Sequence, residues 1–164
     1  MRHSTRQYCI YGAATLSLLF APGAFGGDSF VYHCHAIGVS QAEQLGDKDG
    51  HWMSVAQHTC RAEGGLFDGA IMTGSTIQEY NGPNGIGRAG SGVVRKPGAT
   101  GIYVTTEQKT ALKMADGRVV GFESNTKGRY VMATGTAAAY AGKSYSSTAR
   151  STAPGQFVIE VKFD

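Results

Sequence analysis

Two histidines flank a cysteine at His33, Cys34 and His35, and this is the densest group of chemically active side chains in the 164-residue sequence. On a β-strand, residues i and i+2 point to the same face, so the two histidines share a face and Cys34 lies on the other. An imidazole pair suits Zn or Cu, and His51 is the candidate third ligand. We interpret the histidines as polar surface positions and expect no metal, with His33, His35 and His51 as the alternative metal site.

Cysteine usage points to a disulfide. Of the three cysteines, Cys9 falls in a segment that we expect to be removed, and Cys34 and Cys60 remain. Two cysteines in an exported chain are expected to pair. The two strands then meet on their cysteine faces, and His58, which shares a face with Cys60, lies opposite the histidine pair. A Cys/His metal site is an alternative, but the paired short spacings of structural zinc sites are missing.

Four carboxylates, Glu79, Glu107, Glu123 and Glu160, are candidates for acid–base chemistry. A glycosidase needs two facing carboxylates, and the sequence places no two of these together. We therefore interpret them as solvated strand residues. The sequence contains neither a Gly-x-Ser-x-Gly elbow nor a Gly-x-x-x-x-Gly-Lys phosphate loop. No catalytic residue is assigned from the sequence.

The first 26 residues have the composition of a secretory signal peptide. Arg2 and Arg6 precede an uncharged, partly apolar stretch that ends in small residues, and the first acid is Asp28. We predict cleavage after Gly26, a mature domain at 27–164, and export to the periplasm or the cell exterior. A membrane anchor is the alternative, although the stretch is short for a span and is interrupted by Pro22.

The charge balance excludes some partners. The chain has 15 Lys and Arg against 12 Asp and Glu, and removal of Arg2 and Arg6 leaves 13 against 12. An excess of one charge gives no basic stripe, so we expect no nucleic-acid partner. No later segment approaches 18 apolar residues, so no stable membrane insertion is expected after cleavage. No cofactor is expected, and the oligomeric state is unknown.

Turn signals such as Asp116-Gly117 recur at short intervals, separated by runs rich in Val, Ile, Thr, Tyr and Phe. These runs predict strands at 29–38, 52–62, 68–80, 86–95, 101–113, 118–124, 129–136, 143–151 and 156–163. Asn125–Gly128 is interpreted as a turn, Gly90–Gly92 as a bulge, and 40–45 and 137–141 as short helical turns. The fold class is all-β: one antiparallel barrel of about eight strands, with a β-sandwich as the alternative.

The last strand has the clearest alternation. Phe157, Ile159, Val161 and Phe163 fall on one face, which we expect to be buried. Just upstream, residues 128–143 read GRYVMATGTAAAYAGK, and the chain closes with GQFVIEVKF at 155–163.

A strand, a Gly-Thr segment, an aromatic residue, Ala-Gly and a final strand follow one another here. This order resembles the C-terminal part of the allene oxide cyclase and dirigent barrel superfamily. The resemblance covers 128–164, and Ala137 stands where the usual second glycine would be. It implies an eight-stranded antiparallel barrel with a hydrophobic cavity for a fatty-acid-derived or phenolic ligand. Some members steer cyclisation or coupling of that ligand. None of the family's functional residues can be matched to this chain.

Aromatic residues in such a barrel either fill the core or line a cavity. We select as cavity candidates Trp52, Tyr103, Phe122, Tyr130 and Tyr140. The predicted function is non-catalytic binding of an apolar or amphipathic small molecule. One alternative is a cyclase or isomerase, which a buried Glu or His facing the cavity would favour. The other is a cell-envelope interaction module, which a filled barrel with an exposed apolar patch would favour.

Overall fold

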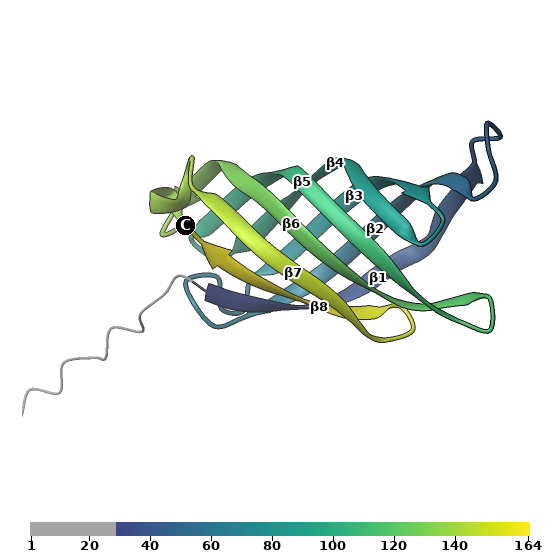
Figure 1. Cartoon of the computed structure of the whole chain (residues 1–164). Coiled ribbons are helices and arrows are strands. Elements are labelled where there is room, and N and C mark those ends of the chain that lie inside the picture. Colours follow the sequence, from purple (N-terminus) through teal and green to yellow (C-terminus); the bar gives the residue numbers. More distant parts are fainter. Residues whose placement is uncertain (1–28) are drawn as a thin grey trace, which may run out of the picture.

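The structure is a computed structural model that describes residues 29–164, apart from the side chains of residues 39 and 40. The predicted signal peptide, its cleavage site and Cys9 lie outside the described residues. Residues 29–164 form eight strands and one short 3-10 helix (Figure 1). In chain order these are β1 (Ser29–Gln44), β2 (His51–Glu63), β3 (Ile71–Asn81), β4 (Asn84–Lys96), β5 (Ala99–Ala115), β6 (Arg118–Gly135), η1 (Ala138–Tyr140), β7 (Ser144–Ala153) and β8 (Gln156–Phe163).

The eight strands form a closed antiparallel barrel. Each strand pairs with the next one in the chain, and β8 returns to pair with β1 along Ser29–His35. Closure leaves no free sheet edge, and it confirms the predicted barrel over the sandwich alternative. No helix within residues 29–164 is both long and apolar enough to cross a membrane.

The predicted turn at Asn125–Gly128 is wrong, because these residues lie inside the 18-residue strand β6. They pair with β5 on one side and with β7 on the other. Gly128 is extended here and gives room to a neighbouring ring, since a methyl group on it would collide with the side chain of Tyr145. The nine predicted strand segments therefore become eight strands.

Two other local predictions are also corrected. Residues 40–45 are not a helical turn: β1 continues to Gln44 after a register shift between Ile37 and Gln41. The bulge predicted at 90–92 lies earlier, because the register of β3 and β4 shifts where Gln78 pairs with Gly87. The short helical turn at 137–141 is confirmed by η1. Bulges of this kind add local twist and help a sheet to close.

One end of the barrel is solid. The rings of Phe30, Phe67, Tyr130, Tyr140 and Phe163 meet there, with centroid separations from 4.3 Å between Tyr140 and Phe163 to 6.0 Å between Phe30 and Phe163. Burial of each such ring contributes roughly 1.5–3 kcal/mol. The helix η1 lies at this end, beside the C-terminus (Figure 1).

The predicted buried face of the last strand is confirmed. Val161 and Phe163 are buried, and Phe157 and Ile159 are half-buried against the same core. The residues between them point outward, as Glu160 does in its ion pair with Arg150. Alternation therefore fixed the orientation of this strand correctly.

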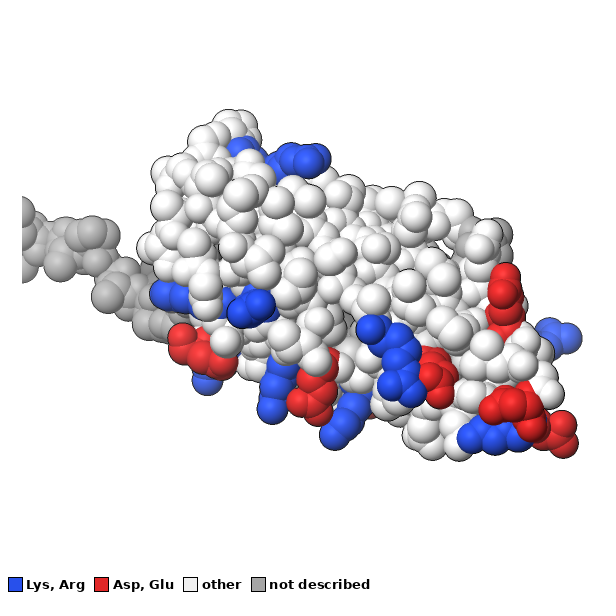
Figure 2. Space-filling model, turned by 90° about the horizontal axis from the view of Figure 1, so that it is seen from above, with Lys and Arg blue, Asp and Glu red and all other residues white. Residues whose placement is uncertain are grey.

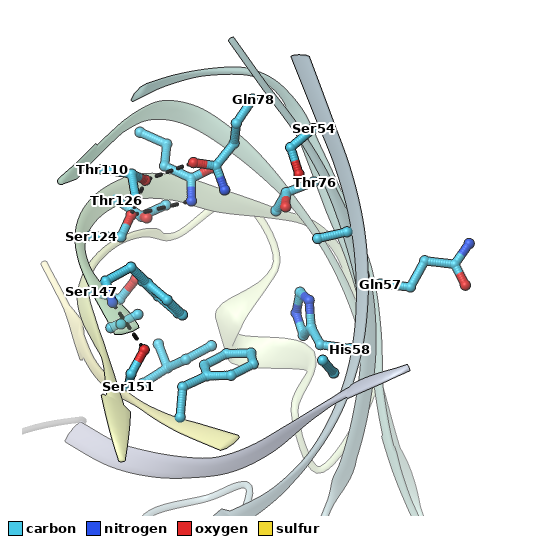
Figure 3. Close-up of a pocket in the computed structure, with 18 of the residues that line it drawn as sticks. Ser54, Gln57, His58, Thr76, Gln78, Thr110, Ser124, Thr126, Ser147 and Ser151 are labelled. Atoms are coloured by element: carbon cyan, nitrogen blue, oxygen red, sulfur yellow. Dashed lines mark hydrogen bonds between the residues drawn. The ribbon is translucent and has the colours of Figure 1, made fainter. Parts of the chain in front are cut away.

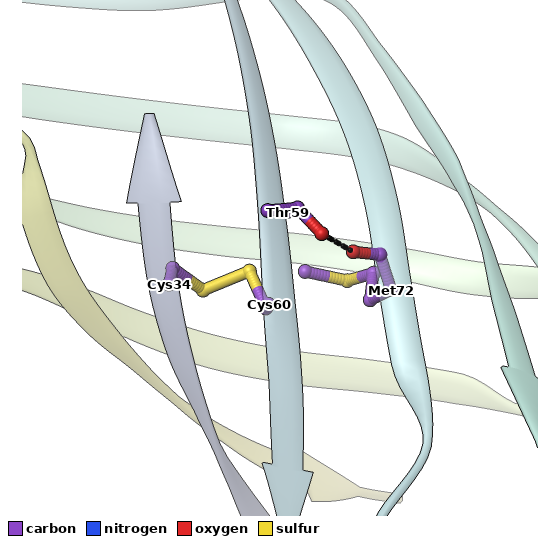
Figure 4. Close-up of a disulfide and its surroundings, with 4 residues drawn as sticks. All are labelled: Cys34, Thr59, Cys60 and Met72. Carbon is purple, nitrogen blue, oxygen red and sulfur yellow. Dashed lines mark hydrogen bonds between the residues drawn. A yellow bond between two sulfur atoms is a disulfide. The ribbon is translucent and has the colours of Figure 1, made fainter. Parts of the chain in front are cut away.

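The predicted disulfide between Cys34 and Cys60 is present (Figure 4). The two residues face each other directly across β1 and β2, with a Cα–Cα distance of 4.0 Å. Both are buried on the inner face, where Met72 of β3 lies beside them. The bond thus links the first two strands of the barrel from the inside.

We expect loss of this bond to lower the free energy of unfolding by roughly 3.5 kcal/mol, because it closes a 26-residue loop in the unfolded chain. Urea unfolding of the Cys34→Ala/Cys60→Ala variant against the parent, both lacking residues 1–26, measures the difference. Thiol labelling of the denatured parent should require reductant. Labelling of both cysteines without reductant would contradict the bond.

Candidate functional site

The barrel encloses a cavity of about 730 Å³. It extends from the solid end toward the end at which the hairpins β1–β2, β3–β4, β5–β6 and β7–β8 turn (Figure 1). At this hairpin end Val119 and Val120 line the cavity and are also exposed to solvent. The cavity is therefore open at one end and closed at the other.

Four tyrosines form the floor of the cavity: Tyr32, Tyr103, Tyr130 and Tyr145. Tyr103 and Tyr145 each lie about 6 Å, centroid to centroid, from the ring of Tyr130. Burial raises the pKa of all four phenols, that of Tyr145 to about 12. The hydroxyls therefore stay protonated and uncharged at neutral pH.

Glycines on neighbouring strands let these rings lie against the barrel wall. A methyl group on Gly101 would stand 2.6 Å from the ring of Tyr130, and one on Gly74 would collide with the hydroxyl of Tyr103. A side chain at either glycine would push the ring toward the barrel axis. Small residues at these positions thus keep the interior above the floor hollow.

One wall of the cavity carries a chain of hydrogen bonds between β3, β5 and β6 (Figure 3). The Thr110 hydroxyl donates to Oε1 of Gln78 at 2.7 Å and lies 3.0 Å from the Ser124 hydroxyl. The Gln108 amide donates to Ser124 at 3.2 Å. The Tyr80 hydroxyl also donates to Oε1 of Gln78, at 3.0 Å.

These contacts fix the orientation of the Gln78 amide. Its oxygen accepts two hydroxyl protons, so its nitrogen faces the cavity (Figure 3). The hydroxyls of Ser54, Thr76 and Thr126 lie on the same side of the interior. This wall therefore presents hydrogen-bonding groups without any net charge.

His58 of β2 points into the cavity (Figure 3) and is only 8% exposed. Its closest ring neighbour is Phe157, edge-on at 5.7 Å. Burial without a nearby carboxylate lowers the pKa of His58 to about 4, so the imidazole is neutral at neutral pH. A methyl group on Gly74 would stand 2.8 Å from Nε2 of His58, which places the imidazole close to the Tyr103 hydroxyl.

The opposite wall is apolar. Phe157, Ile159 and Val161 of β8 line it, together with Phe122 of β6, whose ring packs against Phe157 at 5.5 Å. At the hairpin end Trp52 stacks on Tyr80, with ring centroids 4.1 Å apart and an interplanar angle of 6°. A molecule in the cavity would thus contact a hydrogen-bonding surface on one side and an apolar surface on the other.

Four of the five aromatic residues selected from the sequence line the cavity: Trp52, Tyr103, Phe122 and Tyr130. Tyr140 does not line it. This residue ends η1 and packs behind the floor, 4.3 Å from the ring of Phe163, with the Lys143 ammonium 4.7 Å from its own ring. The segment 128–143 therefore places Tyr130 and Tyr140 on different sides of the same solid end.

The sequence analysis missed the polar wall and gave His58 no role. The prediction that His58 shares a face with Cys60 is confirmed, because both residues lie on the inner face of β2. Gln78 also lies on the inner face of its strand, two residues from Tyr80, but no face was predicted for it. The available signal was a small hydroxyl residue at some of the inner positions, at Thr76 of β3, Thr110 of β5, and Ser124 and Thr126 of β6, but solvated faces carry such residues as well.

The three histidines of the alternative metal site do not come together. His33 and His35 point outward, and His33 contacts Glu63 at 2.8 Å. His51 lies at the other end of β2, where it bonds to Asp47 and Glu79. Residues 29–164 contain no cluster of three or more His, Cys, Asp or Glu side chains suited to holding a metal ion.

The four candidate carboxylates lie on the outside, as interpreted from the sequence. Each is in an ion pair: Glu79 with Arg88, Glu107 with Lys109, Glu123 with Lys113, and Glu160 with Arg150. Lys and Arg alternate with Asp and Glu along one side of the barrel in Figure 2. No carboxylate lines the cavity within the described part of the chain.

Comparison of the chain with family models, with curated proteins and with solved structures finds no match. The fold and the cavity therefore carry the functional argument.

We expect the buried imidazole of His58 to make stability depend on pH. The pKa of His58 is lowered from 6.5 to about 4 by folding, so its contribution is complete above pH 6.5 and is lost as the pH falls toward 4. The loss amounts to roughly 3 kcal/mol over this window. Urea unfolding at stepped pH should show this decline in the parent and a flatter profile in His58→Gln.

His35→Gln is the matched control, because His35 is exposed on the outer face. It should keep the parental profile. Glu79, whose pKa is lowered to about 2 by Arg88 and His51, loses its contribution only at lower pH and does so in every variant. Equal profiles for His58→Gln and the parent would contradict the burial of a neutral imidazole.

Proposed function

We propose that this chain is an exported β-barrel protein that binds an apolar or amphipathic small molecule in its cavity without transforming it. The observation that carries the proposal is the hollow interior of about 730 Å³, open at one end and lined by both apolar and hydrogen-bonding side chains. Ligand sites in proteins range from about 300 to 1,000 Å³ and combine these two kinds of surface.

Export rests on the composition of residues 1–26 and on the Cys34–Cys60 bond. Disulfides persist in oxidising compartments, which agrees with the periplasm or the cell exterior. The relationship to the allene oxide cyclase and dirigent superfamily stays a proposal, since no comparison bears on it.

A cyclase or isomerase is the second candidate, and His58 is the observation that favours it. His58 faces the cavity, and imidazole is the side chain that most often transfers protons in enzymes. Its pKa of about 4 makes it a weak base at neutral pH, which ranks this candidate second. The hollow interior argues against the third candidate, a filled barrel that serves only as an interaction module.

We expect the hydrocarbon dye 1,6-diphenylhexatriene to bind and to fluoresce inside the barrel. Ala56→Phe should weaken this binding by about tenfold or more, ~1.4 kcal/mol, because Ala56 lines the cavity and the added ring occupies the space of the ligand. The matched control is Val55→Phe, since Val55 is exposed on the neighbouring position of β2 and does not line the cavity. Equal affinity in both variants, or no dye binding to the parent, would contradict the proposal.

The non-catalytic reading is tested separately with 2-decanone in D₂O. Deuterium uptake at the carbons beside the carbonyl, followed by mass spectrometry, should not exceed that of buffer. If deuterium uptake is faster with the parent than with His58→Gln, the protein is an isomerase-type enzyme that uses His58, and the non-catalytic proposal is wrong.

A further inference from the structure

The cavity wall carries no fixed charge. None of the described residues that line it is Asp, Glu, Lys or Arg, and His58 and the four floor tyrosines are neutral. The ionic side chains lie outside, where they form pairs such as Arg150 with Glu160 (Figure 2). The inside and the outside of one sheet therefore differ sharply in charge.

This difference bears on the ligand's own charge. A carboxylate or an ammonium group that leaves water costs several kcal/mol unless an opposite charge or several hydrogen bonds replace its hydration. The cavity offers no opposite charge, and His58 would first have to take up a proton against its burial. We therefore expect an ionic ligand to bind in this cavity more weakly than a neutral ligand of the same size.

The wall does offer hydrogen bonds to a neutral oxygen. Oε1 of Gln78 accepts two hydrogen bonds, one from the Thr110 hydroxyl at 2.7 Å and one from the Tyr80 hydroxyl at 3.0 Å. The amide nitrogen is left to donate into the cavity. A carbonyl, ether or hydroxyl oxygen can accept such a bond.

The apolar side is placed to hold the remainder of the molecule. Phe122, Phe157, Ile159 and Val161 form a surface without polar side-chain atoms on the strands β6 and β8. Burial of a hydrocarbon body there contributes about 25 cal/mol for each Å² removed from water.

We propose that the cavity selects an uncharged amphipathic molecule, with an apolar body against β8 and a hydroxyl or carbonyl oxygen that accepts a hydrogen bond from Gln78, and that it rejects the corresponding carboxylates. This inference rests on the proposed binding function and names the chemical class of its ligand.

Competition with bound 1,6-diphenylhexatriene at neutral pH tests it. The competitors are two matched pairs, decan-1-ol with decanoate and 4-butylphenol with 4-butylbenzoate. Each alcohol or phenol should displace the dye at a concentration at least about 30-fold below that of its carboxylate partner.

Gln78→Leu tests the polar contact. It should lower the affinity for decan-1-ol about tenfold relative to the affinity for the dye, the value of one net hydrogen bond, because only decan-1-ol has an oxygen that accepts from Gln78. Gln41→Leu, at an exposed position of β1 that does not line the cavity, should leave both affinities at the parental values. Retained dye binding also shows that Gln78→Leu is folded.

Two kinds of result would contradict these expectations. Carboxylates that compete as well as their neutral partners would overturn the inference and leave the binding function standing. The same holds where neither member of a pair displaces the dye, or where Gln78→Leu binds decan-1-ol like the parent. Failure of the parent to bind the dye would overturn the binding function itself.

Discussion

The contact between tyrosine rings and glycine backbone decides which part of this barrel is solid and which part is hollow. Tyr130 lies against Gly101, and Tyr145 against Gly128, so their rings follow the wall near one end. Beyond them the inner positions hold small or slender residues such as Ser54, Ala56 and Ser147. An eight-stranded barrel can be filled by its own side chains. Here the sizes of the inner residues leave a cavity instead.

The chemistry of the interior follows from the same arrangement. Close packing of the floor removes water from the phenols, and burial then raises their pKa and lowers that of His58. Every titratable group in the cavity is thereby held in its neutral form. The charged residues remain on the outer faces of the same strands, where ion pairs between exposed side chains contribute little to stability.

The sequence was sufficient for the class of fold. Alternation of Phe157, Ile159, Val161 and Phe163 gave the buried face of β8, and Asp116-Gly117 gave a hairpin in which both residues have positive φ. A glycine that serves ring packing was misinterpreted at one position, whereas Gly74 and Gly101 fell within predicted strands. The glycine at 128 was interpreted as part of a turn, although it lies in a continuous strand.

The site was harder to predict than the fold. The four residues Trp52, Tyr103, Phe122 and Tyr130, selected by aromatic type, all line the cavity, because large inner rings either fill or line a barrel. It could not separate Tyr140, which packs behind the floor, since that depends on where η1 folds back. The polar wall depends on the barrel register that brings Gln78 and Thr110 together across β4, over a sequence distance of 32 residues.

We propose that the interior holds a neutral organic molecule. Native mass spectrometry of the mature protein, purified from its own source, can detect such a ligand. We predict a complex whose mass exceeds that of the oxidised polypeptide by one uncharged organic molecule, which is released on denaturation. A bare polypeptide mass, or a bound carboxylic acid or metal ion in its place, would contradict this account.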